Sequence, residues 1–416
     1  MNYADSVQFL YALGNEVKTI KLGLDRIRAV LAALDNPQRA YRVVHVAGTN
    51  GKGSVCALID AGLRAAGVRS GMFTSPHLIE PTERIQIDGN PVSRERFERA
   101  FNVVHEAAGK LDLDVHPTYF ESVTAMAFWL FREMRVETAV VEAGLGGRLD
   151  ATNIVEPALT VITSIDFDHE VYLGNTIEAI AAEKAGILKP GVPAVFAKQR
   201  PDAARVLEAR AADLSIPVTR AEEFEIRDLE VTAVGSRFSG ITCPLAGEHQ
   251  VDNAITAAQA LHALGVDPRG IQEARWPGRL EHVAPNPDII LDGAHNPAGA
   301  RALAAYLRRF YSGSRIWMIF GAMRDKAVGE VGGILFPAAA ELVFTAPGGS
   351  VATRAMPPED LQKLAHRGHM EPTIQAAVEH TLKRASPDDV IIVTGSLYLV
   401  GEARRLFLAP TGGRWQ

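Results

Sequence analysis

Short apolar runs rich in β-branched residues alternate with helical patterns along most of the chain, and this alternation limits the possible folds more than any other feature. The first runs cover residues 43–48, 138–144, 159–166 and 192–197. They are apolar nearly throughout, so we predict strands that are buried on both faces. Between the first two runs, residues 54–66 place their apolar side chains on one helical face. The pattern predicts an α/β fold with a mostly parallel sheet.

The pattern changes in two later segments. In residues 229–246 the alternation around Gly235 and Ser236 predicts a hairpin, and so an antiparallel edge or a small subsheet. Residues 276–288 then concentrate Pro, Gly and Asn ahead of the next strand. We place the domain boundary in this stretch and expect domains over residues 1–280 and 281–416. Further strand-like runs at residues 316–321, 341–346 and 390–395 predict that the second domain is smaller and Rossmann-like.

Size and composition agree with a soluble two-domain enzyme. The chain has 416 residues, of which 47% are hydrophobic and 22% charged. The 43 Lys and Arg against 49 Asp and Glu give a net charge of -6, which argues against a broadly basic surface for nucleic acid or membrane. Cys56 and Cys243 have no metal or disulfide spacing. With no signal peptide and no apolar run of about 18 residues, we expect a cytoplasmic protein.

A glycine-rich string, GTNGKGS, lies between the first predicted strand and the first amphipathic helix. Glycines let backbone N–H groups turn toward a phosphate, the helix N-terminus adds partial positive charge, and Lys52 neutralises phosphate oxygens. The string departs from GxxxxGK[ST], because Val46 holds the first glycine position and Gly53 separates Lys52 from Ser54. The alternative is a glycine-rich turn that binds nothing. The candidate phosphate-binding residues are Gly48, Thr49, Asn50, Gly51, Lys52, Gly53 and Ser54.

Three further loops, over residues 74–78, 142–153 and 164–170, follow strands of the same predicted sheet. Ligands of open α/β folds collect at that edge. A nucleoside triphosphate brings Mg²⁺ that is held by few protein ligands, so Ser75, Glu142 and His169 are the candidate metal ligands. Each has a structural alternative, since Glu142 can be a capping carboxylate and a lone histidine is more often a hydrogen-bonded structural residue.

Eight strings occur in one order over nearly the whole chain: GTNGKGS, TSPHL, GLGGRLDATN, HE followed by EKAGILKPG, HQVDNA, PGRLE, DGAHNP and GAMRDK. The set and order of these strings resemble those of folylpolyglutamate synthase and its bifunctional form with dihydrofolate synthase, within the Mur ligase superfamily. The resemblance implies an N-terminal P-loop domain of Mur ligase type, a smaller C-terminal Rossmann-like α/β domain, and ATP between them. The γ-phosphate would pass to a folate carboxylate, and the amine of glutamate would attack the resulting acyl phosphate.

The resemblance also assigns roles to residues at the nucleotide end. Lys52 would face the β- and γ-phosphates, Asn253, Arg279 and Asp292 would hold ATP, and His295 with Asn296 would face the acyl phosphate or glutamate. Ser75 and Glu142 would bind one Mg²⁺ and His169 a second. Lys184 would be carbamylated and join Lys52 and His295 in catalysis, whereas its sequence context alone favours an exposed helix lysine.

The same resemblance implies a pterin site. Its candidate residues are Lys21, Leu22, Gly23, Leu24, Thr118, Tyr119, Phe120, Glu121, Asp150, Ala151 and Thr152. Tyr119 and Phe120 offer flat apolar faces, although simple core packing also explains them. Lys21 departs from the Asp of some members that make dihydrofolate. Glutamate addition to folates, and also to dihydropteroate, is the expected activity of a monomer whose partners are ATP, L-glutamate and the pterin substrate. The alternatives are a folylpolyglutamate synthase only, another Mur-type ligase, a P-loop switch or kinase, and a purely structural nucleotide-binding module.

Overall fold

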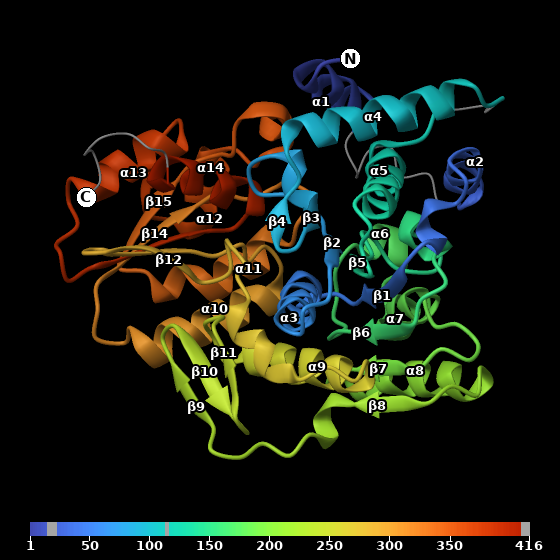
Figure 1. Ribbon diagram of the computed structural model, residues 1–416. Coiled ribbons are helices and arrows are strands. Elements are labelled where there is room, and N and C mark those ends of the chain that lie inside the picture. Colours follow the sequence, from blue (N-terminus) through green and yellow to red (C-terminus); the bar gives the residue numbers. More distant parts are fainter. Residues whose placement is uncertain (15–22, 113–115, 409–416) are drawn as a thin grey trace. The chain divides into compact units, whose positions relative to one another are not determined.

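The computed structural model describes residues 1–14, 23–112 and 116–408, and its contacts divide the chain into two compact units (Figure 1). Unit 1 comprises Met1–Arg227, Ser239–Thr242 and Asp252–Ala274, and unit 2 comprises Asp228–Phe238, Cys243–Val251 and Arg275–Gln416. The chain therefore passes between the units several times. The boundary expected between residues 280 and 281 remains a prediction.

Unit 1 is built on an eight-stranded sheet in the order β4-β3-β2-β5-β1-β6-β7-β8. From β2 to β8 the neighbouring strands are parallel, while β3 and β4 add an antiparallel edge beside β2 that the apolar runs did not predict. The strands are β1 (Arg42–Ala47), β2 (Ser70–Phe73), β3 (Ile85–Ile87), β4 (Asn90–Pro91), β5 (Thr138–Glu142), β6 (Leu159–Ile162), β7 (Ala194–Phe196) and β8 (Val218–Arg220). The predicted α/β class and mostly parallel sheet are confirmed.

The helices of unit 1 follow from apolar stripes and from capping residues. The longer ones are α1 (Tyr3–Ala12), α2 (Asp25–Ala33), α3 (Lys52–Ala65), α4 (Arg94–Gly109), α5 (Tyr119–Glu133), α7 (Ile177–Ala185) and α8 (Pro201–Asp213), with a short α6 (Glu170–Leu173). Helix α9 (His249–Ala263) begins in residues of unit 2 and continues in residues of unit 1. No helix among the described residues is long and apolar enough to cross a membrane.

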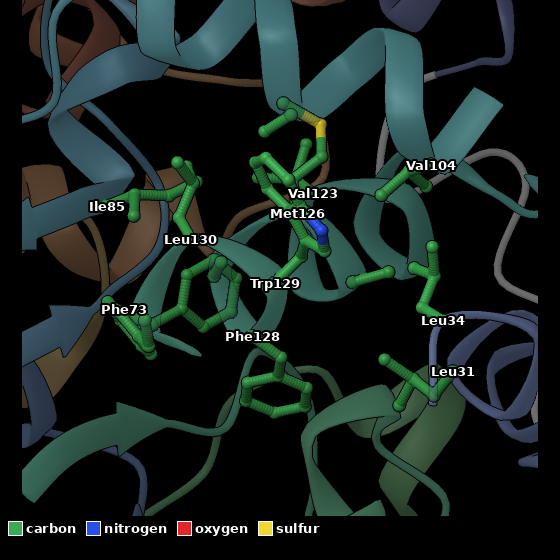
Figure 2. Close-up of a cluster of buried hydrophobic side chains, with 14 of the residues drawn as sticks. Leu31, Leu34, Phe73, Ile85, Val104, Val123, Met126, Phe128, Trp129 and Leu130 are labelled. Atoms are coloured by element: carbon green, nitrogen blue, oxygen red, sulfur yellow. The ribbon is translucent and has the colours of Figure 1, made fainter. Parts of the chain in front are cut away.

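The largest core of unit 1 surrounds α5, which is buried over nearly its whole length (Figure 2). Side chains of α5 such as Phe128 and Leu130 pack with Phe73 of β2, Ile85 of β3 and Leu31 of α2. Each large apolar side chain that is fully buried contributes roughly 1.5–3 kcal/mol relative to exposure. This packing holds the start of α5 in a fixed place beside the sheet.

Unit 2 contains a six-stranded sheet in the order β12-β13-β17-β14-β15-β16. Only β12 is antiparallel to its neighbour. The strands are β12 (Glu281–Pro285), β13 (Asp288–Leu291), β14 (Ile316–Phe320), β15 (Glu341–Phe344), β16 (His369–Met370) and β17 (Val390–Thr394). The helices are α10 (Pro297–Phe310), α11 (Val328–Leu335), α12 (Pro358–Ala365), α13 (Ile374–Leu382) and α14 (Leu397–Leu408). Part of the stretch that we interpreted as a linker is thus an edge strand, a position where Pro285 is tolerated.

The predicted hairpin exists, but its turn lies earlier than expected. Strand β9 (Glu230–Thr232) pairs antiparallel with β10 (Gly235–Phe238), and β11 (Ile241–Cys243) follows. Thr232 closes the turn, because its hydroxyl accepts from the backbone N–H of Val234 and donates to the carbonyl of Gly235. Gly235 is therefore a strand residue, and a Cβ there would lie 2.5 Å from the carbonyl oxygen of Cys243.

Candidate active site

The GTNGKGS loop runs from the end of β1 into α3, as predicted. Gly48 has φ of 150°, and a Cβ on it would lie 1.8 Å from Thr163 Oγ1. Gly51 has φ of 85°, and a Cβ there would lie 2.2 Å from the side-chain oxygen of Asn253. Only glycine fits these two positions. The loop therefore closely approaches both the end of β6 and Asn253, and α3 points its N-terminus at it.

Lys52, Ser75 and Glu142 come together at the carboxyl edge of the unit 1 sheet. Glu142 ends β5 and is buried, and its Oε1 lies 4.0 Å from Lys52 Nζ. Its Oε2 accepts a 3.1 Å hydrogen bond from the backbone N–H of Ser75, just beyond β2. A buried carboxylate suits Mg²⁺, which takes one or two carboxylates and completes its shell with phosphate oxygens and water. This pair of residues fits the first implied metal.

His169 lies in the loop after β6 and immediately precedes α6. It has a positive φ of 54°, and its Nε2 is 3.8 Å from Asp168 Oδ1. The same loop is fastened to the phosphate-binding loop, because Thr49 Oγ1 donates to the carbonyl of Asp166 at 3.0 Å. Among the described residues no group of three or more His, Cys, Asp or Glu has a metal-binding arrangement.

Lys184 is buried, not exposed as its sequence context suggested. Its Nζ donates a 2.8 Å hydrogen bond to the carbonyl of Gly48. Burial, with Lys52 adding to it, lowers the pKa of Lys184 to about 7, against the opposing effect of Asp168 and Asp150. A sequence signal for this burial exists: with Ile177, Ile180 and Ala181, position 184 completes the buried face of α7 at i, i+3, i+4, i+7 spacing.

The pterin-facing candidates around α5 form one cluster. Thr118 and Glu121 make a capping box, in which Glu121 Oε2 accepts from the backbone N–H of Thr118 at 2.8 Å. The Nε of Arg26 also donates to that oxygen, at 3.1 Å. Glu121 Oε1 is buried and has no hydrogen-bond partner among the residues that the structure describes. Glu121 is therefore oriented by two donors to one of its oxygens, and its other oxygen accepts from no residue that the structure describes.

The two aromatic candidates differ. Tyr119 is buried, with its ring 5.9 Å from that of Tyr11 and 5.1 Å from the guanidinium of Arg84. Phe120 is half-buried and lies over Gly144, where a Cβ would come within 2.5 Å of its ring. Tyr119 thus follows the core-packing interpretation, while Phe120 presents part of its face.

Asp150 is buried inside the loop that follows β5. Its carboxylate accepts from the backbone N–H groups of Leu145 and Thr152, at 2.8 and 3.0 Å, and from the hydroxyl of Thr152. Burial raises its pKa, and these donors oppose the rise. Ala151 and Thr152 open a short helical turn, Ala151–Ile154, which Asp150 caps. The side chain therefore shapes the loop.

The remaining pterin candidates precede α2. Gly23 has φ of 143° with open space where a Cβ would stand, and Leu24 precedes the first residue of α2 and packs against the core. Lys21 and Leu22 lie outside the described residues.

In unit 2 the candidates Arg279, Asp292 and His295 gather at the end of β13. Buried Asp292 accepts from the backbone N–H groups of Leu280 and Ala294, both at 3.0 Å. A Cβ on Gly293 would lie 2.6 Å from Arg279 Nη1. His295 donates from Nδ1 to the carbonyl of Gly293 at 2.8 Å, which leaves Nε2 as the unprotonated nitrogen of the neutral ring.

Asn296 and His249 lie close to this cluster in unit 2. Asn296 caps α10 by accepting from the backbone N–H of Gly299 at 2.8 Å. His249 was missed by the sequence reasoning. Burial lowers its pKa, with Asp292 opposing and Arg279 reinforcing the shift. It belongs to the HQVDNA string, but nothing in the spacing of that string links it to Asp292.

Comparisons with known proteins agree with this fold. The model of the Mur ligase middle domain matches residues 46–261, and that of the "Mur ligase, glutamate ligase domain" matches residues 278–397. A folylpolyglutamate synthase of Lacticaseibacillus casei is 35% identical over 98% of this chain and 99% of its own length. A dihydrofolate synthase/folylpolyglutamate synthase of Bacillus subtilis is 36% identical over 93% of this chain and 95% of its own length.

Solved structures point the same way. The folylpolyglutamate synthase of Mycobacterium tuberculosis, complexed with ADP and AMPPCP, superposes with a TM-score of 0.89 at 33% identity over the whole of both chains. The Escherichia coli FolC protein in complex with DHPP and ADP gives 0.87 at 30% identity, covering 98% of this chain and 97% of that one. The chain belongs to the folylpolyglutamate synthase and dihydrofolate synthase family of Mur ligases, and the predicted resemblance is confirmed.

Proposed function

We propose that the protein is an ATP-dependent ligase that adds L-glutamate to folates and to dihydropteroate through an acyl phosphate. One observation carries this proposal: in unit 1 the candidate phosphate-binding residues lie close to the ring of Phe120. Glu142 lies beside Lys52, and Gly144, two residues further on, lies under Phe120. Two residues span at most about 7 Å, so a pterin substrate at Phe120 stays within reach of a bound phosphate.

The chemistry requires activation of a carboxylate. A carboxylate is a poor acyl donor, because its leaving group would be oxide, whereas an acyl phosphate expels phosphate. Residues 48–54 and the N-terminus of α3 would hold the triphosphate, and Lys52 would stabilise charge on the transferring phosphoryl group. Ser75 and Glu142 would hold one Mg²⁺, and His169 with Asp168 would contribute to a second. When bound, Mg²⁺ neutralises phosphate charge and orients the phosphate oxygens.

Lys184 suits a carbamate. A pKa of about 7 leaves much of the amine neutral near pH 7, so its lone pair can attack the carbon of CO₂ while one proton leaves to water. The carbamate nitrogen keeps one N–H, which can still donate to the carbonyl of Gly48. Its anionic oxygens would then lie in the same region as the proposed metal ligands.

The carbamate is tested with labelled CO₂. Under ¹³CO₂ a carbamate carbon signal should appear in the wild-type protein and be missing from Lys184→Ala. The variant should lose activity that bicarbonate does not restore and that a small carboxylic acid partly restores. A wild-type protein without the signal, in an active preparation, would exclude the modification.

The unit 2 cluster has a proposed role within the same reaction. In unit 2, Arg279 and Asp292 would hold ATP, and His295 with Asn296 would face the acyl phosphate or the incoming glutamate. In unit 1, Asn253 would hold ATP. The resemblance supports these roles, as does the convergence of Arg279, Asp292 and His295 at one strand end. Use of ATP as a substrate favours a cytoplasmic location, and the monomeric state remains a prediction.

The activity is tested by ADP release with ATP and Mg²⁺ while glutamate and the acceptor are varied separately. Turnover should require glutamate and proceed with tetrahydrofolate and with dihydropteroate. Lys21, in place of the Asp of some dihydrofolate-making members, favours the narrower candidate, a folylpolyglutamate synthase only. Turnover with tetrahydrofolate and none with dihydropteroate would establish that candidate. Glutamate-independent ATP hydrolysis alone would contradict both.

A further inference from the structure

His45 is a buried polar side chain that the reaction described above does not use. It lies in β1, three residues before Gly48, on the strand that enters the phosphate-binding loop. Its ring is fully buried, and its Nε2 lies 2.8 Å from Thr152 Oγ1. Thr152 belongs to the loop that contains Asp150, more than a hundred residues further along the chain. His45 therefore joins two segments that serve opposite ends of the proposed substrates.

The hydrogen bonds between these residues run in one direction. The single hydroxyl hydrogen of Thr152 is donated to Asp150 Oδ1 at 2.5 Å, so the hydroxyl can only accept from His45. Nε2 of His45 consequently carries the ring hydrogen. Nδ1 is bare, buried and without a hydrogen-bond partner among the residues that the structure describes. Burial, followed by the charge of Lys189, lowers the pKa of His45 to about 3, so the ring stays neutral.

Asp150 connects Thr152 to the rest of its loop through hydrogen bonds. Its other oxygen accepts from the backbone N–H of Leu145, beside Gly144, on which Phe120 packs. The series of hydrogen bonds thus connects β1, through Thr152 and Asp150, to the backbone next to the Phe120 ring. Without the His45 donor, Thr152 loses its side-chain hydrogen bond to β1, and the Asp150 carboxylate is then held only from within its own loop.

We propose that His45 is a positioning residue for the acceptor substrate: through Thr152 and Asp150 it sets the acceptor loop at a fixed distance from the phosphate-binding loop. The inference rests on the proposed function, since it assumes that the pterin substrate lies against this loop. It concerns the placement of the substrate and assigns His45 no contact with the reacting atoms.

The test compares His45→Leu with His45→Gln. Leucine fills the space without a donor, whereas the glutamine amide can donate to Thr152 in place of Nε2. We expect His45→Leu to raise the KM for tetrahydrofolate about ten-fold while the KM for ATP changes by less than about two-fold. His45→Gln should restore most of the loss.

Thr160→Val is the matched control. Thr160 is buried, pairs with His45 across β1 and β6, and donates its hydroxyl to the carbonyl of Pro193, away from the acceptor loop. This variant loses a buried hydroxyl from the same sheet, so it reproduces any general destabilisation. Its KM for tetrahydrofolate should match that of the wild type.

A second pair of variants keeps the test decisive if His45→Leu does not fold. Thr152→Val removes the bridging hydroxyl and should raise the KM for tetrahydrofolate, while Thr152→Ser keeps the hydroxyl and should not. Histidine ¹⁵N NMR should show the Nε2–H form of His45 without titration between about pH 5 and about pH 8.

Three results would overturn the inference. They are a folded His45→Leu with unchanged KM for tetrahydrofolate, no rescue by His45→Gln where leucine has raised the KM, and a ring proton on Nδ1. Failure of the proposed function is distinguishable, because the wild-type protein would then show no glutamate-dependent turnover at all, whatever the state of His45.

Discussion

The proposed phosphate end and the proposed acceptor end of unit 1 both involve loops that follow strands of one sheet, yet they are built differently. At the phosphate end, glycine geometry, a helix N-terminus and two lysines create a positive region whose contacts are mostly to backbone. At the acceptor end, the carboxylates of Glu121 and Asp150 are buried and held by directed hydrogen bonds, the first from Arg26 and the second from the backbone of its own loop. The difference predicts that changes at the first end lower kcat, whereas changes at the second raise the KM of the acceptor.

Lys52→Ala should give the largest effect. Removal of a preorganised charge facing the transferring phosphoryl group should lower kcat by about 10³-fold, equivalent to about 4 kcal/mol, while the KM for tetrahydrofolate changes little. Steady-state kinetics at saturating ATP measures this. Lys198→Ala, an exposed lysine of the same unit, is the control and should keep wild-type turnover. A folded Lys52→Ala with most of its turnover would remove the distinction between the two ends.

The depressed pKa of Lys184 makes stability depend on pH. The folded-state pKa is about 7 and the ordinary value 10.5, so between them the unfolded chain binds more protons. The free energy of unfolding should therefore rise with pH across this window, by up to about 1.4 kcal/mol per pH unit, and the burial penalty is fully present below about pH 7.

Lys184→Met should flatten this rise, which urea unfolding in CO₂-free buffer at several pH values would show. CO₂ is excluded because a carbamate would mask the titration. An equal rise in both proteins would mean that Lys184 is not the group responsible.

Glu121→Gln addresses the acceptor end. The amide replaces the anionic oxygens that Arg26 and a ligand N–H would share, so the KM for tetrahydrofolate should increase about ten-fold with kcat largely kept. Glu133→Gln, at the other end of α5 and more exposed, is the matched control and should change neither constant. A fall in kcat without a change in KM would place Glu121 among the catalytic groups instead.

The smallest expected effect comes from Thr118→Ala. Loss of the cap on α5 should lower the free energy of unfolding by about 1 kcal/mol. Because the Thr118 hydroxyl accepts from the backbone N–H of Glu121, its loss loosens the first turn of α5, which carries Glu121, and the KM for tetrahydrofolate should rise by about two- to three-fold. Chemical denaturation and kinetics of the same preparation separate the two effects. Thr118→Ser, which keeps the cap, should behave as the wild type.

Local patterns predicted much of the fold and the position of the glycine-rich loop between β1 and α3. Apolar runs gave the parallel strands, and the glycine string gave a loop whose Gly48 and Gly51 admit no side chain. Contacts across long separations were beyond such patterns. Arg26 reaches Glu121 over 95 residues, and His45 meets Thr152 over 107. Strands β3 and β4 are too short to show an apolar run in the sequence. The burial of Lys184 was not predicted, because a lysine on a helix is usually expected to be exposed even where its neighbours on that face are apolar.

The repeated passage of the chain between the two units limits how the protein can be taken apart. The β9–β10 hairpin and the first three residues of α9 belong to unit 2, although they precede the last segment of unit 1 in the chain. No single cleavage site therefore yields two complete halves. A fragment ending at Ala274 would carry this hairpin and the start of α9 away from the rest of unit 2, so exchanging or truncating one unit at a single junction always leaves pieces of the other behind.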